Sequence, residues 1–271
     1  MKECGGIIQS QGDGWMLTQD RQRRILDELA QKKSVTVTEL VEEIGVSEST
    51  IRRDLVALDK AGRLSKVHGG ATALEHEFVA GEYDVNTKSK MNAKEKDEIA
   101  RYAATLINDQ DYVFIDAGTS TEAVISYLNN DKATYVTNGI VHAKKLIAKG
   151  YKTYMIGGRV KPVTEAVVGA EGVRSLMKYN FTKAFVGTNG IHKEFGYTTV
   201  DVEEAAIKRE IVKRSYVTYI LADHTKFDLV TAIRFADIEE ACIITDYCTK
   251  EKYKTATVLK EVLKHDLHSD I

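Results

Sequence analysis

Residues 46–58, Val-Ser-Glu-Ser-Thr-Ile-Arg-Arg-Asp-Leu-Val-Ala-Leu, specify an amphipathic helix together with its start. Ser47 follows a turn, and its hydroxyl can accept hydrogen bonds from the N–H groups that the first turn of a helix leaves free. Ile51, Leu55 and Leu58 recur at i, i+4 and i+7, which is the spacing of one buried stripe. The stretch therefore predicts a helix that begins after Ser47 and packs its apolar stripe inward.

The outward face of the same helix is polar and positively charged. A rotation of about 100° per residue places Ser49, Arg53 and Lys60 opposite the apolar stripe, with Arg52 on the flank. Hydroxyl and guanidinium groups suit the phosphates and base edges of duplex DNA. The pattern favours a DNA-binding regulator over an enzyme.

The flanking sequence completes a helix-turn-helix with a wing. Apolar periodicity predicts a first helix over residues 20–31, and the Thr-Val-Thr-Glu sequence at residues 36–39 fits the capping box of a second helix that ends at Gly45. Two short helices joined by Gly-Val-Ser form a helix-turn-helix. The alternating residues 64–68, two glycines and residues 71–74 predict a two-stranded wing.

A small helical bundle with solvated Arg52 and Arg53 is the alternative interpretation. The wing favours the DNA-binding interpretation, because a winged reader uses such a hairpin beside its recognition helix. His68 lies in the wing, where it either touches phosphate or packs locally. The residues expected to contact DNA are Ser47, Ser49, Thr50, Arg52, Arg53, Lys60, Lys66 and His68.

This part of the sequence resembles a known family of DNA-binding proteins. The sequence Ser-Glu-Ser-Thr-Ile-Arg-Arg-Asp-Leu at residues 47–55, then Leu58, Gly62 and residues 67–71, is similar to the N-terminal signature of the DeoR family of bacterial transcriptional repressors. The resemblance implies a winged reader that places the helix from Ser47 in the major groove and its wing against the backbone or the minor groove.

The composition is that of an ordinary globular protein. The chain has 271 residues, 43% hydrophobic and 29% charged, and no run of roughly 18 apolar residues that could span a membrane. Its formal net charge is -2, yet residues 47–74 hold five basic and three acidic residues. Because phosphate attraction depends on where the cations lie, such a chain can bind DNA with modest nonspecific affinity. We expect it to bind double-stranded operator DNA as a homo-oligomer, a dimer or a tetramer.

The cysteines and the first residues indicate a reduced, cytoplasmic protein. Cys4, Cys242 and Cys248 are odd in number and distant from any CxxC spacing. The first 15 residues have one basic residue and a short apolar pair, so they lack the features of a secretory signal. We expect a disordered leader over residues 1–15, a winged domain over 16–74, a polar linker over 75–91 and an effector-sensing domain over 92–271.

The larger domain alternates β-rich runs with helical ones. This alternation predicts an α/β domain with a doubly wound, mostly parallel sheet and helices on both faces, in which ligands gather beyond the carboxyl ends of the strands. The expected strands lie at residues 112–116, 133–137, 152–156, 184–186, 217–221 and 241–245, and helices are expected to begin near Ser120, Ile140, Gly169, Val202 and Ala256.

Polar residues gather at the predicted carboxyl ends of these strands. The Asp-Ala-Gly-Thr-Ser-Thr sequence at residues 116–121 leaves a strand and opens a helix, so its glycine, hydroxyls and helix N-terminus can hold an anion such as phosphate. Each such loop alone is more often a simple turn, so the convergence of five loops carries the interpretation. The other four supply Thr137 and Asn138; Gly158, Arg159 and Lys161; Thr188 and Asn189; and Asp223 and Lys226.

The DeoR resemblance extends from Thr18 to about Thr245. In the larger domain it is carried by residues 116–121, 136–138, 157–158 and 222–227 together with Lys208. It implies an effector domain similar to the sugar-phosphate isomerase and CoA-transferase fold. By this likeness the phosphate is held by Gly118, Thr119, Ser120 and Thr121, the sugar hydroxyls by Asp116 and Asn138, and the charge is completed by Arg159, Lys208 and Lys226.

The resemblance also points to one class of effector. Residues 137–140, 187–191 and 196–199 are most similar to the fructose-operon branch of the family, which implies fructose 1-phosphate as the inducer. The lactose-operon branch, with tagatose 6-phosphate, is the rival. No cofactor is expected.

An isomerase-like enzyme fused to a DNA-binding domain is the remaining alternative. Asp116, Glu165, Asp223 and His224 could supply a base, but their sequence shows no recognisable catalytic pairing. The histidines lack ligand spacing for a metal, and neither a Walker A lysine nor a GxGxxG turn is present. We therefore expect a regulator rather than an enzyme, with no metal site.

Overall fold

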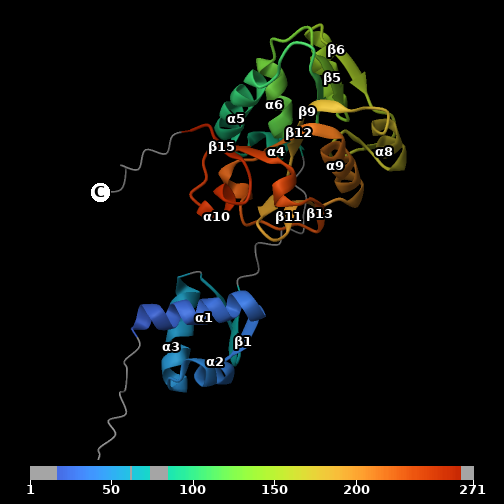
Figure 1. Ribbon diagram of the computed structural model, residues 1–271. Helices are drawn as coiled ribbons and strands as arrows, with labels where there is room; N and C mark the ends of the chain where they lie inside the picture. Colours follow the sequence, from blue (N-terminus) through green and yellow to red (C-terminus); the bar gives the residue numbers. More distant parts are fainter. Residues whose placement is uncertain (1–16, 62, 74–84, 264–271) are drawn as a thin grey trace, which may run out of the picture. The chain divides into compact units, whose positions relative to one another are not determined.

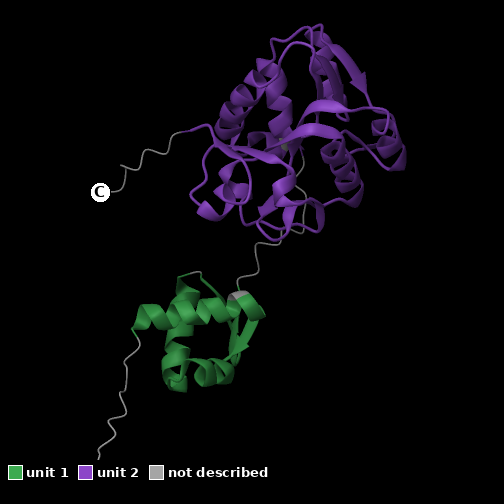
Figure 2. Ribbon diagram, in the orientation of Figure 1, with its two compact units in different colours: residues 1–75 green, residues 76–271 purple. Residues whose placement is uncertain are grey.

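The chain folds as two compact units. The computed structural model describes residues 17–61, 63–73 and 85–263. The units are Met1–Glu75 and His76–Ile271, which Figure 2 colours separately. The predicted leader over residues 1–15 lies outside the described residues, and so do residues 75–84 of the predicted linker.

The N-terminal unit is a helix-turn-helix with a three-stranded sheet. The antiparallel strands have the order β1-β3-β2, so the predicted wing is present as β2 and β3. β1 was not predicted, because three residues between two helices leave too little alternation to recognise. The elements are α1 (Thr18–Lys32), β1 (Ser34–Thr36), α2 (Val37–Ile44), α3 (Glu48–Lys60), β2 (Ser65–Val67) and β3 (Gly70–Thr72).

Side-chain caps fix where two of these helices begin. Thr36 Oγ1 accepts from the Glu39 N–H (3.2 Å), and Glu39 Oε2 accepts from the Thr36 N–H (2.7 Å), so the predicted capping box is present. Ser47 is the N-cap of α3, and its Oγ accepts from the Thr50 N–H at 3.4 Å. The predicted stripe of α3 is buried, in a core formed by Ile25, Leu29, Leu40, Ile51, Leu55 and Leu58.

The second unit is built on a seven-stranded parallel sheet (Figure 1). Its strand order is β15-β14-β12-β9-β4-β5-β6, so the winding direction reverses between β4 and β9. This confirms the predicted doubly wound sheet. The strands are β4 (Tyr112–Ile115), β5 (Thr134–Thr137), β6 (Lys152–Met155), β9 (Phe181–Gly187), β12 (Ser215–Leu221), β14 (Cys242–Thr245) and β15 (Leu259–Glu261).

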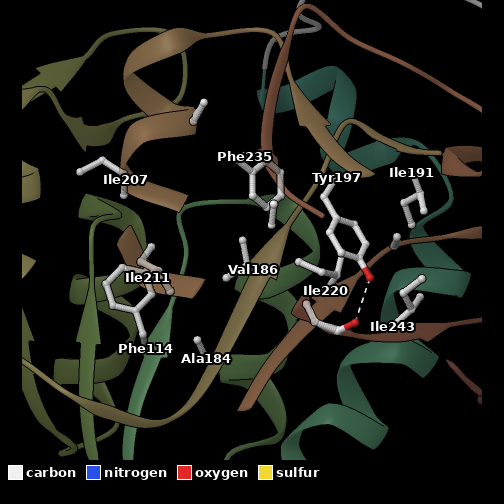
Figure 3. Close-up of a cluster of buried hydrophobic side chains, with 14 of the residues drawn as sticks. Phe114, Ala184, Val186, Ile191, Tyr197, Ile207, Ile211, Ile220, Phe235 and Ile243 are labelled. Atoms are coloured by element: carbon white, nitrogen blue, oxygen red, sulfur yellow. Dashed lines mark hydrogen bonds between the residues drawn. The ribbon is translucent and has the colours of Figure 1, made fainter. Parts of the chain in front are cut away.

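Helices cover both faces of the sheet. Consecutive strand residues point to opposite faces, so Val113 packs with the helices of one layer and Phe114 with those of the other. One layer holds α5 (Ala93–Thr105), α6 (Thr119–Tyr127) and α7 (Ile140–Ala148), and the other holds α8 (Ala170–Leu176) and α9 (Val202–Arg214). Figure 3 shows the second layer, where Ile207 and Ile211 of α9 lie beside Phe114 and Val186.

The C-terminal part differs from the prediction. The helix predicted near Ala256 is wrong, because the chain forms α10 (Glu251–Lys254) and then the edge strand β15. Pairing of Ile243 with Leu259 adds this segment to the sheet, and that gain outweighs the helical spacing of its apolar residues. Also unpredicted are the hairpin β7 (Arg159–Lys161) and β8 (Ala166–Val168), and a small sheet of β10 (Gly190–His192), β11 (Gly196–Thr199) and β13 (Ile233–Ala236).

The described end of the predicted linker is helical. Val85–Lys90 form α4, which packs against α6 of the second unit. Asn92 then takes a left-handed conformation (φ 50°) between α4 and α5. The second unit therefore begins before the predicted residue 92.

Candidate functional site

The outward face of α3 is exposed, as a recognition surface requires. Arg52, Arg53 and Lys60 are all solvent-exposed. At the start of the helix the Ser47 Oγ lies 3.0 Å from Ser49 Oγ and 2.9 Å from Thr50 Oγ1. The first turn thus presents three connected hydroxyls, which can reorient as donors or acceptors toward phosphate.

The two neighbouring arginines of α3 differ in their partners. Arg52 donates from Nε and Nη2 to Glu48 Oε1, at 2.8 and 2.5 Å, one helical turn earlier. The guanidinium of Arg53 has neither a hydrogen-bond nor an ion-pair partner among the residues that the structure describes. Arg53 is therefore more available than Arg52 to an incoming ligand.

Asp54 anchors the recognition helix to the rest of the unit. Its carboxylate is buried and accepts from Arg21 Nε and, at 3.2 Å, from Arg21 Nη2. Gln22 Nε2 also donates to it, at 3.4 Å. Sequence analysis missed this residue, although Asp54 lies three positions after Ile51 on the buried face of the helix.

The wing is attached to the recognition helix by a second carboxylate. Asp59 Oδ1 on α3 accepts from the Lys66 N–H on β2 at 2.8 Å. The side chains of Lys66 and His68 are exposed. The bond fixes where β2 begins relative to α3, so the two elements expected to face DNA move together.

A cavity of about 730 Å³ lies in the second unit at the carboxyl ends of the central strands. Asp116 follows β4 and Gly187 ends β9, so the cavity lies at the reversal of strand order, where α/β sheets bind ligands. Nine of the fifteen residues predicted to hold an effector line it: Asp116, Gly118, Thr119, Ser120, Thr188, Asn189, Lys208, Asp223 and Lys226.

The N-terminus of α6 forms one wall of this cavity. Gly118 is its N-cap, and Thr119 and Ser120 contribute the first N–H groups of a nine-residue helix. Thr121 is buried instead: its Oγ1 accepts from the Gly118 N–H (3.1 Å) and donates to the Gly118 carbonyl oxygen (2.8 Å). Thr121 therefore shapes the turn, while the residues before it present a positive helix end to the cavity.

His142 supports this turn from beneath. Its Nε2 lies 3.1 Å from the Gly118 carbonyl oxygen, to which it donates. Burial lowers the pKa of the His142 imidazole below its usual value. The neutral ring is then a structural donor and adds no charge to the wall.

The charge of Lys208 is already compensated. Its ammonium group donates to Asp116 Oδ2 and, at 2.9 Å, to the Gly187 carbonyl oxygen. The same Asp116 oxygen accepts from the Gly187 N–H at 3.1 Å. Lys208 and Asp116 thus form a neutral, hydrogen-bonded floor.

Positive charge without a carboxylate partner comes from Lys226 and Lys96. The Lys226 ammonium has no hydrogen-bond or ion-pair partner in the described part of the chain. Lys96, which is 7% exposed, donates to the carbonyl oxygen of Lys88. Burial lowers the pKa of Lys96, the charges of Lys226 and Lys88 lower it further, and Asp223 opposes them. A bound anion would stabilise both ammonium groups.

Sequence analysis missed Lys96, although a signal was present. Lys96 shares one face of α5 with Ile99, Ala100 and Ala103, all buried. A lysine on an otherwise apolar helical face is unusual, because an ammonium group is rarely buried without a reason. Other cavity residues that were not predicted are Lys88, Asn92, Thr164, Glu204 and Thr225.

Two predicted site residues lie beneath the cavity and position its loops. Asn138 Oδ1 accepts from the Ala117 N–H (2.8 Å), and its Nδ2 donates to the Val167 carbonyl oxygen (3.4 Å). Thr137 Oγ1 accepts from the Gly139 N–H at 3.0 Å. Both side chains are buried, so they hold the Asp116–Thr121 turn rather than face the cavity.

Three further predicted residues, Gly158, Arg159 and Lys161, also lie outside the cavity lining. Arg159 forms an ion pair with Glu203, and Lys161 with Asp201 (3.2 Å) and Glu204 (3.1 Å). A Cβ at Gly158 would lie 2.8 Å from a Val167 methyl, so this glycine permits close packing. Lys161 acts on the site indirectly, because its partner Glu204 is a lining residue.

The described residues provide neither a metal-binding cluster nor a membrane-spanning helix. No group of three or more His, Cys, Asp or Glu side chains is placed to hold a metal ion there. None of the described helices is long and apolar enough to cross a membrane.

Each of the two units matches a known protein family. A family profile described as a DeoR-like helix-turn-helix domain matches residues 21–77, and one described as the DeoR C-terminal sensor domain matches residues 91–247.

Full-length relatives cover most of this chain. An HTH-type transcriptional regulator of Bacillus subtilis, FruR, is 39% identical over 251 residues, which are 91% of this chain and 99% of that protein. The lactose phosphotransferase system repressor of Staphylococcus aureus is 34% identical over 246 residues, 88% and 97% of the two chains. Ribose 5-phosphate isomerase A of Methanocaldococcus jannaschii superposes with a TM-score of 0.38 at 12% identity, over 50% of this chain and 55% of that one.

Proposed function

The chain belongs to the DeoR family of transcriptional regulators, and from that premise we propose that it represses a sugar-utilisation operon until a phosphorylated sugar binds its second unit. The predicted family is confirmed, and so is the prediction of a regulator rather than an enzyme, since its relatives are named as a transcriptional regulator and a repressor. One observation carries the proposal: a single chain combines an exposed cationic recognition helix with a cavity suited to an anion.

The DNA-binding part of the proposal assigns α3 to the major groove. Arg53 reads a base edge, Arg52 and Lys60 contact phosphates, and the hydroxyls of the first turn contact the backbone. Lys66 and His68 of the wing contact the neighbouring backbone. Two or four copies of this cytoplasmic chain bind operator half-sites related by twofold symmetry, since one helix of 13 residues reads few base pairs.

The effector part of the proposal assigns the phosphate to the α6 wall. Lys96 and Thr119 also line a small second cavity of about 180 Å³, so the Lys96 side chain and the first turn of α6 border the same space. With Lys226 these groups supply charge and N–H donors for a phosphate. The sugar hydroxyls then face acceptors from the other walls, notably Glu204 and Asn189.

Glu204 suits the sugar end because its carboxylate is fixed in position by two donors and can still accept a further hydrogen bond. Its Oε1 accepts from Lys161 (3.1 Å) and from Thr164 Oγ1 (3.0 Å), which leaves further lone pairs for a hydroxyl. Asn189 Oδ1 accepts from Thr199 Oγ1 at 2.9 Å, which orients its amide. A sugar phosphate would therefore bind in one orientation.

Fructose 1-phosphate is the proposed effector. The likeness of residues 137–140, 187–191 and 196–199 to the fructose-operon branch favours it. Tagatose 6-phosphate is the second candidate, because the lactose phosphotransferase system repressor is also similar over most of its length.

A ligand series tests the proposal. Operator sequences are first selected from random duplexes with the full-length protein. Its affinity for the selected duplex is then measured with fructose 1-phosphate, tagatose 6-phosphate, fructose or inorganic phosphate, and calorimetry gives each ligand's own affinity. We expect fructose 1-phosphate to weaken operator binding about 5- to 150-fold, a coupling of about 1–3 kcal/mol. Unchanged operator affinity at saturation with every phosphorylated sugar would overturn the proposal.

A further inference from the structure

The segment that follows the linker forms part of the cavity wall. Val85, Lys88 and Ser89 of α4 line the cavity, as do Met91 and Asn92. These residues are the first that the structure describes after the DNA-binding unit in sequence. The cavity therefore borders the part of the second unit that follows the linker in sequence.

Asn92 ties this segment to the loop after β12. Its Nδ2 donates to Asp223 Oδ1 at 2.9 Å and lies 3.4 Å from Thr225 Oγ1. The bond joins residues 131 positions apart. The left-handed backbone at Asn92 directs the chain from α4 into α5, a conformation that asparagine and glycine adopt at low cost.

The other end of this bond is held firmly. Asp223 is buried and also accepts from the Thr225 N–H (3.1 Å), so it caps the turn that carries Lys226. Behind the turn, the fully buried Asp246 accepts from the His224 N–H (2.7 Å) and from His224 Nδ1 (2.5 Å). Because these bonds fix the turn to the sheet, the Asn92 bond attaches the linker-proximal segment to a firmly held wall, beside the packing of α4 on α6 and the bond from Lys96 to the Lys88 carbonyl oxygen.

We propose that Asn92 is a positioning residue that couples effector occupancy to the linker, through its hydrogen bond to Asp223. The inference rests on the proposed function. An effector that contacts Lys96, Lys226 and α4 holds these three walls of the cavity together. The Asn92 bond connects α4 to the turn that carries Lys226. Without the bond, the effector still binds the α6 wall, but α4 is then held by its packing on α6 and the bond from Lys96 to Lys88, so its position depends much less on occupancy.

Asn92→Gly tests this in the full-length protein. Glycine keeps the left-handed backbone and removes the amide. Asn129→Gly, at an exposed loop position, is the matched control. We expect Asn92→Gly to bind the selected operator as tightly as wild type without effector, while saturating fructose 1-phosphate changes its operator affinity less than about 2-fold, against the 5- to 150-fold of the wild type and control.

Hydrogen exchange gives a second, independent measurement. Fructose 1-phosphate should protect amides of residues 85–92 in wild type and in Asn129→Gly, and this protection should be lost in Asn92→Gly while protection at the start of α6 persists. A wild-type coupling factor in Asn92→Gly at saturation, or wild-type protection of residues 85–92, would overturn the inference and leave the proposed function intact. Failure of the wild-type protein itself to respond to any phosphorylated sugar would overturn both.

Discussion

The ammonium group of Lys208 on α9 donates to the carboxylate of Asp116 at the end of β4, across 92 positions of sequence. Both side chains are almost fully buried, and the Gly187 backbone completes their hydrogen bonding. The pair therefore holds α9 against the centre of the sheet. The pair also distinguishes two lysines of the cavity. Lys208 neutralises a buried carboxylate, whereas the Lys226 ammonium has no such partner in the described part of the chain.

Lys208→Met should destabilise the second unit. The substitution leaves the Asp116 carboxylate buried with the Gly187 N–H but without a cation, and breaking a buried ion pair costs about 3 kcal/mol. Denaturant unfolding of the full-length protein measures the change. Lys213→Met, at an exposed position of the same helix, should unfold like wild type. Equal stability of the two variants would show that the pair contributes little.

Lys226→Ala should weaken effector binding selectively. Hydrogen bonds to charged groups contribute about 1.5–3 kcal/mol, so we expect a loss of about 10- to 150-fold in affinity for fructose 1-phosphate by calorimetry. Operator affinity without effector should stay unchanged, because Lys226 belongs to the second unit. Lys193→Ala removes an exposed lysine of the same unit as a control. Wild-type ligand affinity in Lys226→Ala would show that this ammonium is simply solvated.

Lys96 should make effector binding sensitive to alkaline pH. Burial lowers the pKa of the free protein's Lys96, and a bound phosphate raises it again because it favours the ammonium form. Between these two pKa values binding takes up a proton, so affinity falls as pH rises. Calorimetry in buffers of different ionisation enthalpy measures how many protons are taken up for each ligand that binds. Lys96→Met should bind more weakly and take up no such proton, and an unaltered proton count in this variant would assign the uptake to another group.

Arg53→Ala should reduce specific DNA binding. If this side chain contacts a base edge, its loss costs about 1–3 kcal/mol and relaxes selectivity at one operator position. Selection from random duplexes followed by titration gives both quantities. Arg174→Ala, in the second unit, keeps the charge change but should leave DNA binding and selectivity unaltered. A binding curve for Arg53→Ala that matches wild type would remove Arg53 from the reading surface.

Asp54→Ala should loosen the recognition helix. The substitution removes the carboxylate that pairs with the Arg21 guanidinium, which is 12% exposed, at a cost of about 3 kcal/mol. Amides of α1 and α3 should then exchange roughly 100-fold faster, while those of the second unit are unaffected. Glu42→Ala, at an exposed position of α2, is the control. Unchanged exchange in α1 would mean that the apolar core alone holds the helix.

Local signals in the sequence predicted most of the fold. The capping box at Thr36 and the stripe of Ile51, Leu55 and Leu58 depend on neighbours within one helix, so their spacing is sufficient. The parallel sheet follows from the alternation of strands and helices. By contrast, β15 exists because Ile243 pairs with Leu259, a partner that helical periodicity within residues 256–263 cannot reveal.

The cavity was less predictable than the fold, because its members come from distant segments. The strand-end loops placed Asp116 and Lys226 in it correctly by topology. Spacing could not show that Asn138 turns beneath the loop, nor that Arg159 is engaged by Glu203. Lys96 and Asn92 were not predicted because both precede β4, the first described strand of the second unit, and so do not follow the end of any strand of that sheet.

The Glu48 carboxylate beside Arg52 gives the recognition helix a built-in competitor for phosphate. A phosphate that engages Arg52 must displace this carboxylate, whose negative charge then stays beside the DNA, so the pair attracts phosphate less than a lone arginine would. Arg53 keeps its full attraction and acts where a base edge also fits. We therefore expect the Glu48 carboxylate to weaken the hold of this helix on non-target DNA.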